Sequence, residues 1–269
     1  MKANVVGYAF FTAIVIGIVA AGLHFSETTI STFVSYPPYM FLSEKDVVEF
    51  IRGDADRYIA NLSPLDLAAR GVGTPQRYVD KAVKAADEFS AGEKRRLIAA
   101  GKAADLRIIN TSHTSSINGF DAYKATYIPW CFAKTAGRTY EDGMPHTRLD
   151  VIFLPETIVT PDSDEEYLVD TLIHEKIHIY QRRYPEDIFK FIQANKFIQW
   201  KKRADDPLAR ANPDLDPYIY ISGREPMIAQ YNSDSPADIS DVTIYPINKP
   251  DYEHPYELMA YQIVKTTHL

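Results

Sequence analysis

Cysteine is nearly absent from this sequence, because Cys131 is the only one in 269 residues. A single thiol excludes an intrachain disulfide framework and any zinc site built from several thiolates. A metal site would therefore have to use histidine and carboxylate side chains. Basic residues are also in deficit, with 29 lysines and arginines against 36 aspartates and glutamates and a formal net charge of −7. This balance argues against a nucleic-acid partner, which would need a positively charged surface.

Segments of strongly biased composition are lacking as well. Hydrophobic residues make up 46% of the chain and charged residues 24%, which are values of a globular protein. They argue against a disordered, collagen-like or low-complexity chain. No internal repeat is visible, and no stretch after Ser43 is linker-like for long enough to require a second domain. We predict one domain over residues 43–269.

One long hydrophobic run, VVGYAFFTAIVIGIVAAGL, covers Val5–Leu23 without a charge. At about 1.5 Å per residue, a helix of this length just spans a hydrocarbon core of about 30 Å. The run predicts a single-pass membrane anchor. Lys2 lies ahead of it, so the positive-inside rule places residues 1–4 in the cytoplasm and the rest of the chain on the non-cytoplasmic side. The alternative is a cleaved signal peptide ending near Ala20-Ala21-Gly22, which would make the protein secreted.

Residues 24–42 predict a juxtamembrane stalk, because the segment is rich in threonine and serine and contains Pro37-Pro38. Two acceptor triplets for N-glycosylation, at Asn61 and Asn110, are compatible with a non-cytoplasmic domain.

Hydrophobic periodicity in the remaining chain predicts an α+β fold, mainly helical with a small sheet. The first half has helical periodicity, and the second half alternates helices with short β-branched runs. The expected helices are Ser43–Phe50, Asp54–Ala69, Pro75–Phe89, Ala91–Ile108, Ser163–Tyr184, Glu186–Arg203 and Pro255–Lys265, and the expected strands are Leu149–Leu154, Pro217–Ile221 and Asp241–Ile247.

The helix over 163–184 carries the most informative pattern, His174-Glu175-Lys176-Ile177-His178. Ser163 and Glu166 have the spacing of a capping box, and Pro185 disfavours helical geometry in the residue before it. Residues four apart lie one above the other on a helix, so both imidazoles can reach one ion, and the adjacent glutamate can reach a water molecule on that ion. The expected core stripe of this helix is Val169, Leu172, Ile173, Ile177 and Tyr180.

A catalytic zinc ion usually has three protein ligands, so a third must come from elsewhere in the chain. Glu257 falls in the first turn of the last helix. With Ala260, Tyr261 and Val264 it forms one face that can pack against the histidine helix, and the small alanine would let the two helices approach. His254 and Glu253 are the reserve candidates.

These residues resemble those of the zincin metallopeptidases, and more specifically the gluzincin arrangement, in which a later helix supplies a glutamate ligand. The resemblance covers HEKIH and the segment EHPYELMAY. It implies a zincin-like domain in which His174, His178 and Glu257 bind zinc and Glu175 is the general base. The sequence lacks the glycine and third histidine of the metzincins, and it has Tyr261 where several gluzincins have an acidic residue.

By this resemblance the protein would be a membrane-anchored zinc hydrolase that cleaves a peptide or protein substrate. Asp170, one turn before His174, is a candidate to support a histidine ligand. The oxyanion donor is left open, and His146 is a candidate for the edge of the cleft. The candidates for the donor are Tyr220, Tyr231, His254, Tyr261 and Arg210.

Three alternatives stay open at this point. The histidine helix could be an exposed amphipathic helix without a metal. The chain could be an inactive zincin-like binding or structural protein, although a structural metal site needs no general base such as Glu175. It could also be a zinc hydrolase of non-peptide substrates, because a fold does not identify a substrate.

Overall fold

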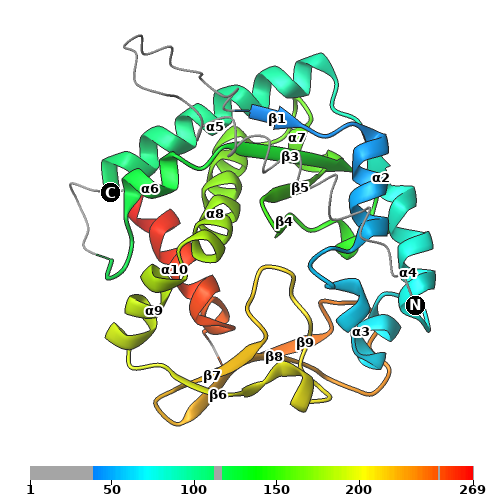
Figure 1. Cartoon of the computed structure of the whole chain (residues 1–269), viewed down its shortest axis with the longest axis vertical. Helices are drawn as coiled ribbons and strands as arrows, with labels where there is room; N and C mark the ends of the chain where they lie inside the picture. Colours follow the sequence, from blue (N-terminus) through cyan, green and yellow to red (C-terminus); the bar gives the residue numbers. More distant parts are fainter. Residues whose placement is uncertain (1–38, 112–116, 248, 269) are drawn as a thin grey trace, which may run out of the picture.

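The computed structural model of the chain describes residues 39–111, 117–247 and 249–268. The predicted cytoplasmic tail, the Val5–Leu23 anchor and most of the stalk lie outside the described residues. The predicted α+β class is confirmed, with two small sheets instead of one. Figure 1 shows the two sheets at opposite ends of the molecule, with helices between and around them.

The first sheet has a parallel centre, in which β3 (Trp130–Thr135) lies between β1 (Tyr39–Phe41) and β5 (Val151–Pro155). β4 (His146–Arg148) pairs antiparallel with β5 and forms one edge, and β2 (Ala86–Asp87) pairs with the end of β3. The residues predicted as the end of the stalk thus belong to a sheet, because Tyr39–Phe41 pair with β3.

Side chains of β3 and β5 alternate between two hydrophobic clusters, which explains why both strands are buried throughout. Phe132, Ile152 and Leu154 pack into the cluster that includes α5 (Ala91–Thr111) and α8 (Glu165–Arg183). Ala133 and Phe153 face the other cluster, together with α2 (Glu44–Gly53) and α4 (Pro75–Ala82). The remaining helices of four residues or more are α3 (Pro64–Ala69), α6 (Ala122–Thr126), α7 (Glu156–Val159), α9 (Pro185–Ala194) and α10 (Pro255–Thr266).

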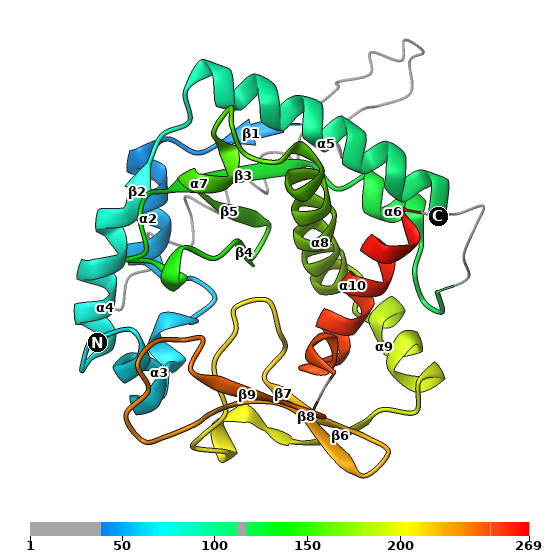
Figure 2. The same ribbon diagram turned by 180° about the vertical axis from the view of Figure 1, so that it is seen from behind.

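The second sheet is antiparallel, in the order β6 (Ile198–Lys202), β7 (Tyr218–Ser222), β8 (Glu225–Tyr231) and β9 (Val242–Tyr245). It lies beyond the C-terminal end of α8, on the side of the molecule away from α5 (Figures 1 and 2). α8 and α10 lie side by side between the two sheets in both views, and they make many contacts with each other. This packing positions the predicted ligands.

Four predicted helices occur with small shifts at their ends, namely those that became α2, α5, α8 and α10, and so do the strands β5, β7 and β9. The prediction for 75–89 is wrong after Ala82, because a short 3₁₀ turn follows and Ala86–Asp87 pairs with β3 as a strand. The prediction for 54–69 is wrong before Pro64, because Asp54 adopts a left-handed φ of 41° and Asp54 and Asp56 bind Arg148. The prediction for 186–203 is wrong after Ala194, because Lys196 has φ 58° and Ile198–Lys202 pairs with β7 as a strand.

The cap of α8 also differs from the prediction. Asp164, and not Ser163, accepts hydrogen bonds from the backbone amides of Glu166 and Tyr167, at 2.8 and 3.1 Å. The hydroxyl of Ser163 instead donates to backbone carbonyls of the preceding turn. The predicted core stripe of this helix is confirmed, because all five of its residues are buried.

Among the described helices, none is both long enough and apolar enough to cross a lipid bilayer.

Candidate metal centre

Two helices bring the three predicted ligands together. His174 and His178 lie one turn apart on α8, and Glu257 lies in the first turn of α10. Nε2 of His174 is 3.0 Å from Nε2 of His178 and 3.1 Å from Oε2 of Glu257, and Nε2 of His178 is 3.8 Å from the same oxygen. In the part of the chain that the structure describes, this is the one cluster of histidine, cysteine and carboxylate groups with dimensions that suit a metal ion.

The three ligand atoms, Nε2 of His174, Nε2 of His178 and Oε2 of Glu257, form a triangle whose dimensions fit a zinc site. Tetrahedral zinc with ligands at about 2.0–2.2 Å holds its ligand atoms about 3.3 Å apart. The three distances scatter around that value, so shifts of a few tenths of an ångström would bring all three atoms onto one ion. Two imidazole nitrogens 3.0 Å apart also require a proton or a cation between them, because two lone pairs would repel each other.

The local sequence explains why both helices begin where they do. Asp164 caps α8 and Pro185 follows its last turn, so the histidines lie in the regular interior of the helix. α10 begins with Pro255 at its first position, and Nδ1 of His254 accepts a hydrogen bond from the backbone amide of Tyr256 at 3.2 Å. Glu257 is therefore held two residues after a fixed helix start.

Two neutral side chains hold the ligands. Nδ1 of His178 is 3.0 Å from Oε1 of Gln181, and the Nδ2 amide of Asn212 donates to Oε1 of Glu257 at 3.0 Å. The ring of His174 packs edge-on against the ring of Tyr261, with centroids 4.6 Å apart. These contacts leave Nε2 of each histidine and Oε2 of the glutamate facing one another.

The ionisation of the ligands suits a cation. Burial acts to raise the pKa of Glu257, but the neighbouring His178 and His174 outweigh it and hold this pKa well below its usual range. Burial is the main cause of a lowered pKa of His178. At neutral pH the cluster therefore offers a carboxylate and a neutral buried imidazole, which are the metal-binding forms of these groups.

Glu175 lies beside the cluster but outside it. Its side chain is buried, with 4% of the residue exposed, and its Oε2 has no hydrogen-bond partner. Burial, and secondarily the charges of Asp214 and Glu257, raise the pKa of Glu175 well above its usual value. A carboxylate in this environment readily accepts a proton, which is the property of a general base.

These groups line a cavity of about 570 Å³ between α8, α10, the β4 segment and residues 210–214. Within the described ranges, three buried side-chain atoms have no hydrogen-bond partner: Glu175 Oε2, His146 Nε2 and Arg210 Nε. All three residues line this cavity. Buried polar atoms are normally paired, so their concentration here is typical of a site that binds a polar ligand or water.

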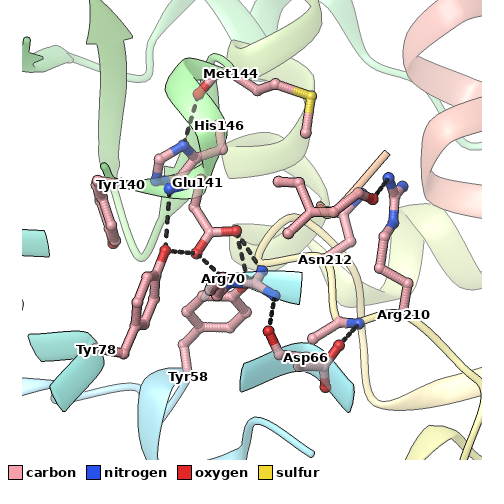
Figure 3. Close-up of polar contacts among 12 residues, drawn as sticks. Tyr58, Asp66, Arg70, Tyr78, Tyr140, Glu141, Met144, His146, Arg210 and Asn212 are labelled. Carbon is pink, nitrogen blue, oxygen red and sulfur yellow. Dashed lines mark hydrogen bonds and ion pairs between the residues drawn. The ribbon is translucent and has the colours of Figure 1, made fainter. Parts of the chain in front are cut away.

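The wall opposite α8 is held by a buried ion pair. Arg70 binds Glu141, which also accepts hydrogen bonds from Tyr58 at 3.0 Å and Tyr78 at 2.6 Å (Figure 3). His146 lies next to this group in the same view, and its Nδ1 contacts the backbone oxygen of Met144 at 2.9 Å. His146 is buried and lines the cavity.

The remaining candidate residues differ in whether they line the cavity or are bound elsewhere. Tyr261 and Arg210 line the cavity, whereas Tyr220 and Tyr231 do not, because their hydroxyls donate to Asp216 and Asp66. The reserve ligands are engaged elsewhere, because Glu253 binds Arg210 and His254 contacts Asp216. Asp170 does not support His174; instead, it pairs with Arg107 and His268.

Sequence reasoning missed Gln181, Asn212 and Asp214. Gln181 has a detectable signal, because it lies three residues after His178 on the same helix face. Asn212 and Asp214 lie in a turn-rich segment with no such periodicity. Asp214 accepts hydrogen bonds from the amide and hydroxyl of Thr147, at 2.7 and 2.5 Å, so this segment is fixed to the edge strand β4.

Comparison with models of known protein families finds no match to this chain, and comparisons with characterised proteins and with solved structures find none either.

Proposed function

We propose that this protein is a membrane-anchored, zinc-dependent peptidase of the zincin type. The observation that carries the proposal is the His174, His178 and Glu257 triangle with the unpartnered carboxylate of Glu175 beside it. The membrane anchor is Val5–Leu23, with the folded part of the chain on the non-cytoplasmic side.

Each residue has a distinct task in this proposal. His174, His178 and Glu257 would hold zinc, which when bound polarises a substrate carbonyl and acidifies a water molecule. Glu175 accepts the proton of that water and delivers it to the leaving amine. Tyr261 and Arg210 are the two oxyanion-donor candidates that line the cavity.

The cavity has the dimensions of a binding site for a small molecule or for a short part of a larger substrate. Its volume is about 570 Å³, and its lining combines apolar residues with the polar groups of the centre. The apolar residues include Met144, Pro145, Ile239, Ile244 and Val264. Peptide bonds, as opposed to other hydrolysable bonds, are proposed on the resemblance to zincins.

An inactive binding or structural protein is the second candidate. A structural metal site needs ligands but no base, and it needs no buried carboxylate without a partner. The position of Glu175 and its lack of a hydrogen-bond partner at Oε2 therefore favour the hydrolase.

The test is the zinc content of the full-length chain purified in detergent. We expect about one zinc per chain in the wild type, loss of zinc in His178→Ala and Glu257→Ala, and no change in His268→Ala. The last variant removes a histidine outside the triangle and is the matched control. Binding should weaken on acidification, because protons compete for the imidazoles.

A wild-type chain without zinc would overturn the proposal. Full zinc content in Glu257→Ala would overturn the assignment of the third ligand. Digestion of a broad peptide library by the zinc-loaded protein separates a peptidase from a hydrolase of other substrates.

A further inference from the structure

We infer that Gln181 is a positioning residue of this centre: it fixes the tautomer of His178 and joins the two helices that carry the ligands. The inference deepens the proposed function and rests on it for the identity of the ion. Gln181 does not line the cavity, and its amide contacts none of the three atoms that would bind the ion, which are Nε2 of the two histidines and Oε2 of Glu257.

The side chain of Gln181 bridges α8 and α10. It is fully buried, one turn after His178. Its Oε1 is 3.0 Å from Nδ1 of His178, and its Nε2 donates to the backbone oxygen of Tyr256 at 2.9 Å. Tyr256 immediately precedes Glu257, so one amide group connects a ligand on α8 to the backbone beside a ligand on α10.

The orientation of this amide follows from its partners. A backbone carbonyl oxygen can only accept a hydrogen bond, so the NH₂ group of Gln181 must face Tyr256. The amide oxygen must then face His178, and because that oxygen can only accept, Nδ1 of His178 must carry the proton.

The position of this proton decides what His178 offers to a metal. A neutral imidazole with its proton on Nδ1 has the lone pair on Nε2, the nitrogen that faces His174 and Glu257. The opposite tautomer would point a proton at the ion. Gln181 therefore prepares His178 for metal binding before any ion arrives.

The loss of metal affinity that follows from removing such a contact is known from other metal sites. Removing the partner of a ligand histidine typically weakens metal affinity by about 10-fold to 100-fold. We expect an effect in this range for Gln181→Met, which keeps a similar length and volume but has neither the acceptor nor the donor.

The experiment compares full-length wild type, Gln181→Met, Gln181→Glu and Gln193→Met. Gln193 lies exposed on α9, so its variant is the matched control for the same chemical change. Zinc dissociation constants come from competition with a chelator. The tautomer of His178 in the metal-free protein comes from two-bond ¹H–¹⁵N NMR spectra above the imidazole pKa, with His178→Ala giving the assignment.

We expect the wild type and Gln193→Met to have the Nδ1–H tautomer and equal zinc affinity. Gln181→Met should show mixed tautomers and an affinity about 10-fold to 100-fold lower. Gln181→Glu keeps an acceptor for His178 but has no donor for the backbone oxygen of Tyr256, so it should restore the Nδ1–H tautomer while losing the contact with α10. If Gln181→Met does not fold, the tautomers of the wild type and of Gln181→Glu decide, because the inference requires Nδ1–H in both.

An Nδ1–H tautomer retained in folded Gln181→Met, with zinc affinity within twofold of wild type, would overturn the inference. The Nε2–H tautomer in the wild type would also overturn it. Failure of the proposed function can be distinguished from failure of this inference. A wild type that binds no zinc contradicts the metal centre, whereas its NMR spectrum still reports whether Gln181 sets the tautomer of His178.

Discussion

Glu175 shows how the environment of one residue determines its chemistry. Lys176 and Glu175 are neighbours on α8, yet the lysine is paired with Asp105 whereas Oε2 of the glutamate has no partner. A buried group without a partner is costly to maintain, so its presence beside the three candidate ligands supports the proposed role in proton transfer.

Glu175→Gln should therefore separate metal binding from catalysis. The substitution keeps the size and hydrogen-bonding capacity of the side chain but removes the basic carboxylate. We expect zinc content and fold to be retained while peptide hydrolysis falls by about 10²-fold to 10⁴-fold. Zinc analysis and initial cleavage rates on the same preparation check this.

The matched control is Glu225→Gln, which makes the same chemical change at an exposed position of β8. It should leave both zinc content and rate unchanged. Undiminished cleavage by Glu175→Gln would mean that hydrolysis comes from another site or a contaminant, and the role of this helix would have to be withdrawn.

At the scale of elements, the centre depends on how closely α10 approaches α8. Ala260 lies one turn after Glu257 and is fully buried in the cluster that includes α8. A small residue at this position lets the helix backbones approach, and the approach brings Glu257 within 3.1 Å of His174.

Ala260→Leu should force the two helices apart. Adding three carbon atoms to a filled core costs about 1–3 kcal/mol of unfolding free energy. We expect zinc affinity to fall at the same time, because Glu257 moves with α10. Chemical denaturation and chelator competition measure the two effects.

The exposed residue Ala194, at the end of α9, provides the control. Ala194→Leu should change neither stability nor zinc affinity appreciably. Unaltered zinc affinity in Ala260→Leu would show that the spacing of the helices does not set the position of Glu257.

At the scale of the whole molecule, buried ion pairs connect the N-terminal helices to the two sheets. Arg70 of the segment after α3 binds Glu141, and Arg148 of β4 binds Asp54 and Asp56. Arg203, next to β6, reaches Asp66 of α3 at 3.1 Å. Glu141 of the first pair lines the cavity, and breaking any of these pairs would leave a buried charge.

Glu141 makes the first of these pairs dependent on pH. Burial alone would raise the pKa of Glu141, but the guanidinium of Arg70 outweighs it and lowers the pKa to about 2. Because the pKa is lower in the folded state than in the unfolded state, the stabilisation is present above pH 4.5 and is lost as the pH falls toward 2.

We expect Glu141→Gln to be less stable than wild type at pH 7, with the difference narrowing by about 3 kcal/mol between pH 5 and pH 2. Urea denaturation at a series of pH values measures this, and the exposed variant Glu225→Gln should show no such narrowing. A difference independent of pH would contradict the assignment of the stabilisation to this carboxylate.

The topology of the chain in the cell is a separate prediction, based on the Val5–Leu23 run and Lys2. Carbonate-washed membranes should retain the full-length protein, and protease added from the non-cytoplasmic side should attack the domain. A soluble mature protein that begins near Gly22–Ser26 would instead support the signal-peptide alternative.

The sequence by itself determined the features that depend on local interactions. Hydrophobic periodicity and helix-boundary residues locate α8 and α10, and the spacing of His174 and His178 puts both on one helix face. Glu257 could be proposed because its place in the first turn of α10 is also local. The helix predicted through Arg203 failed because pairing with β7 outweighs helical periodicity after Ala194.

Tertiary structure alone decided which side chains complete the centre. Glu257 was the first choice from the sequence, with His254 and Glu253 in reserve, and the packing of α10 on α8 is what brings Glu257 to the histidines. The support from Asn212 joins residues 45 positions apart in sequence. Such contacts depend on the relative positions of distant elements, and no local periodicity encodes these positions.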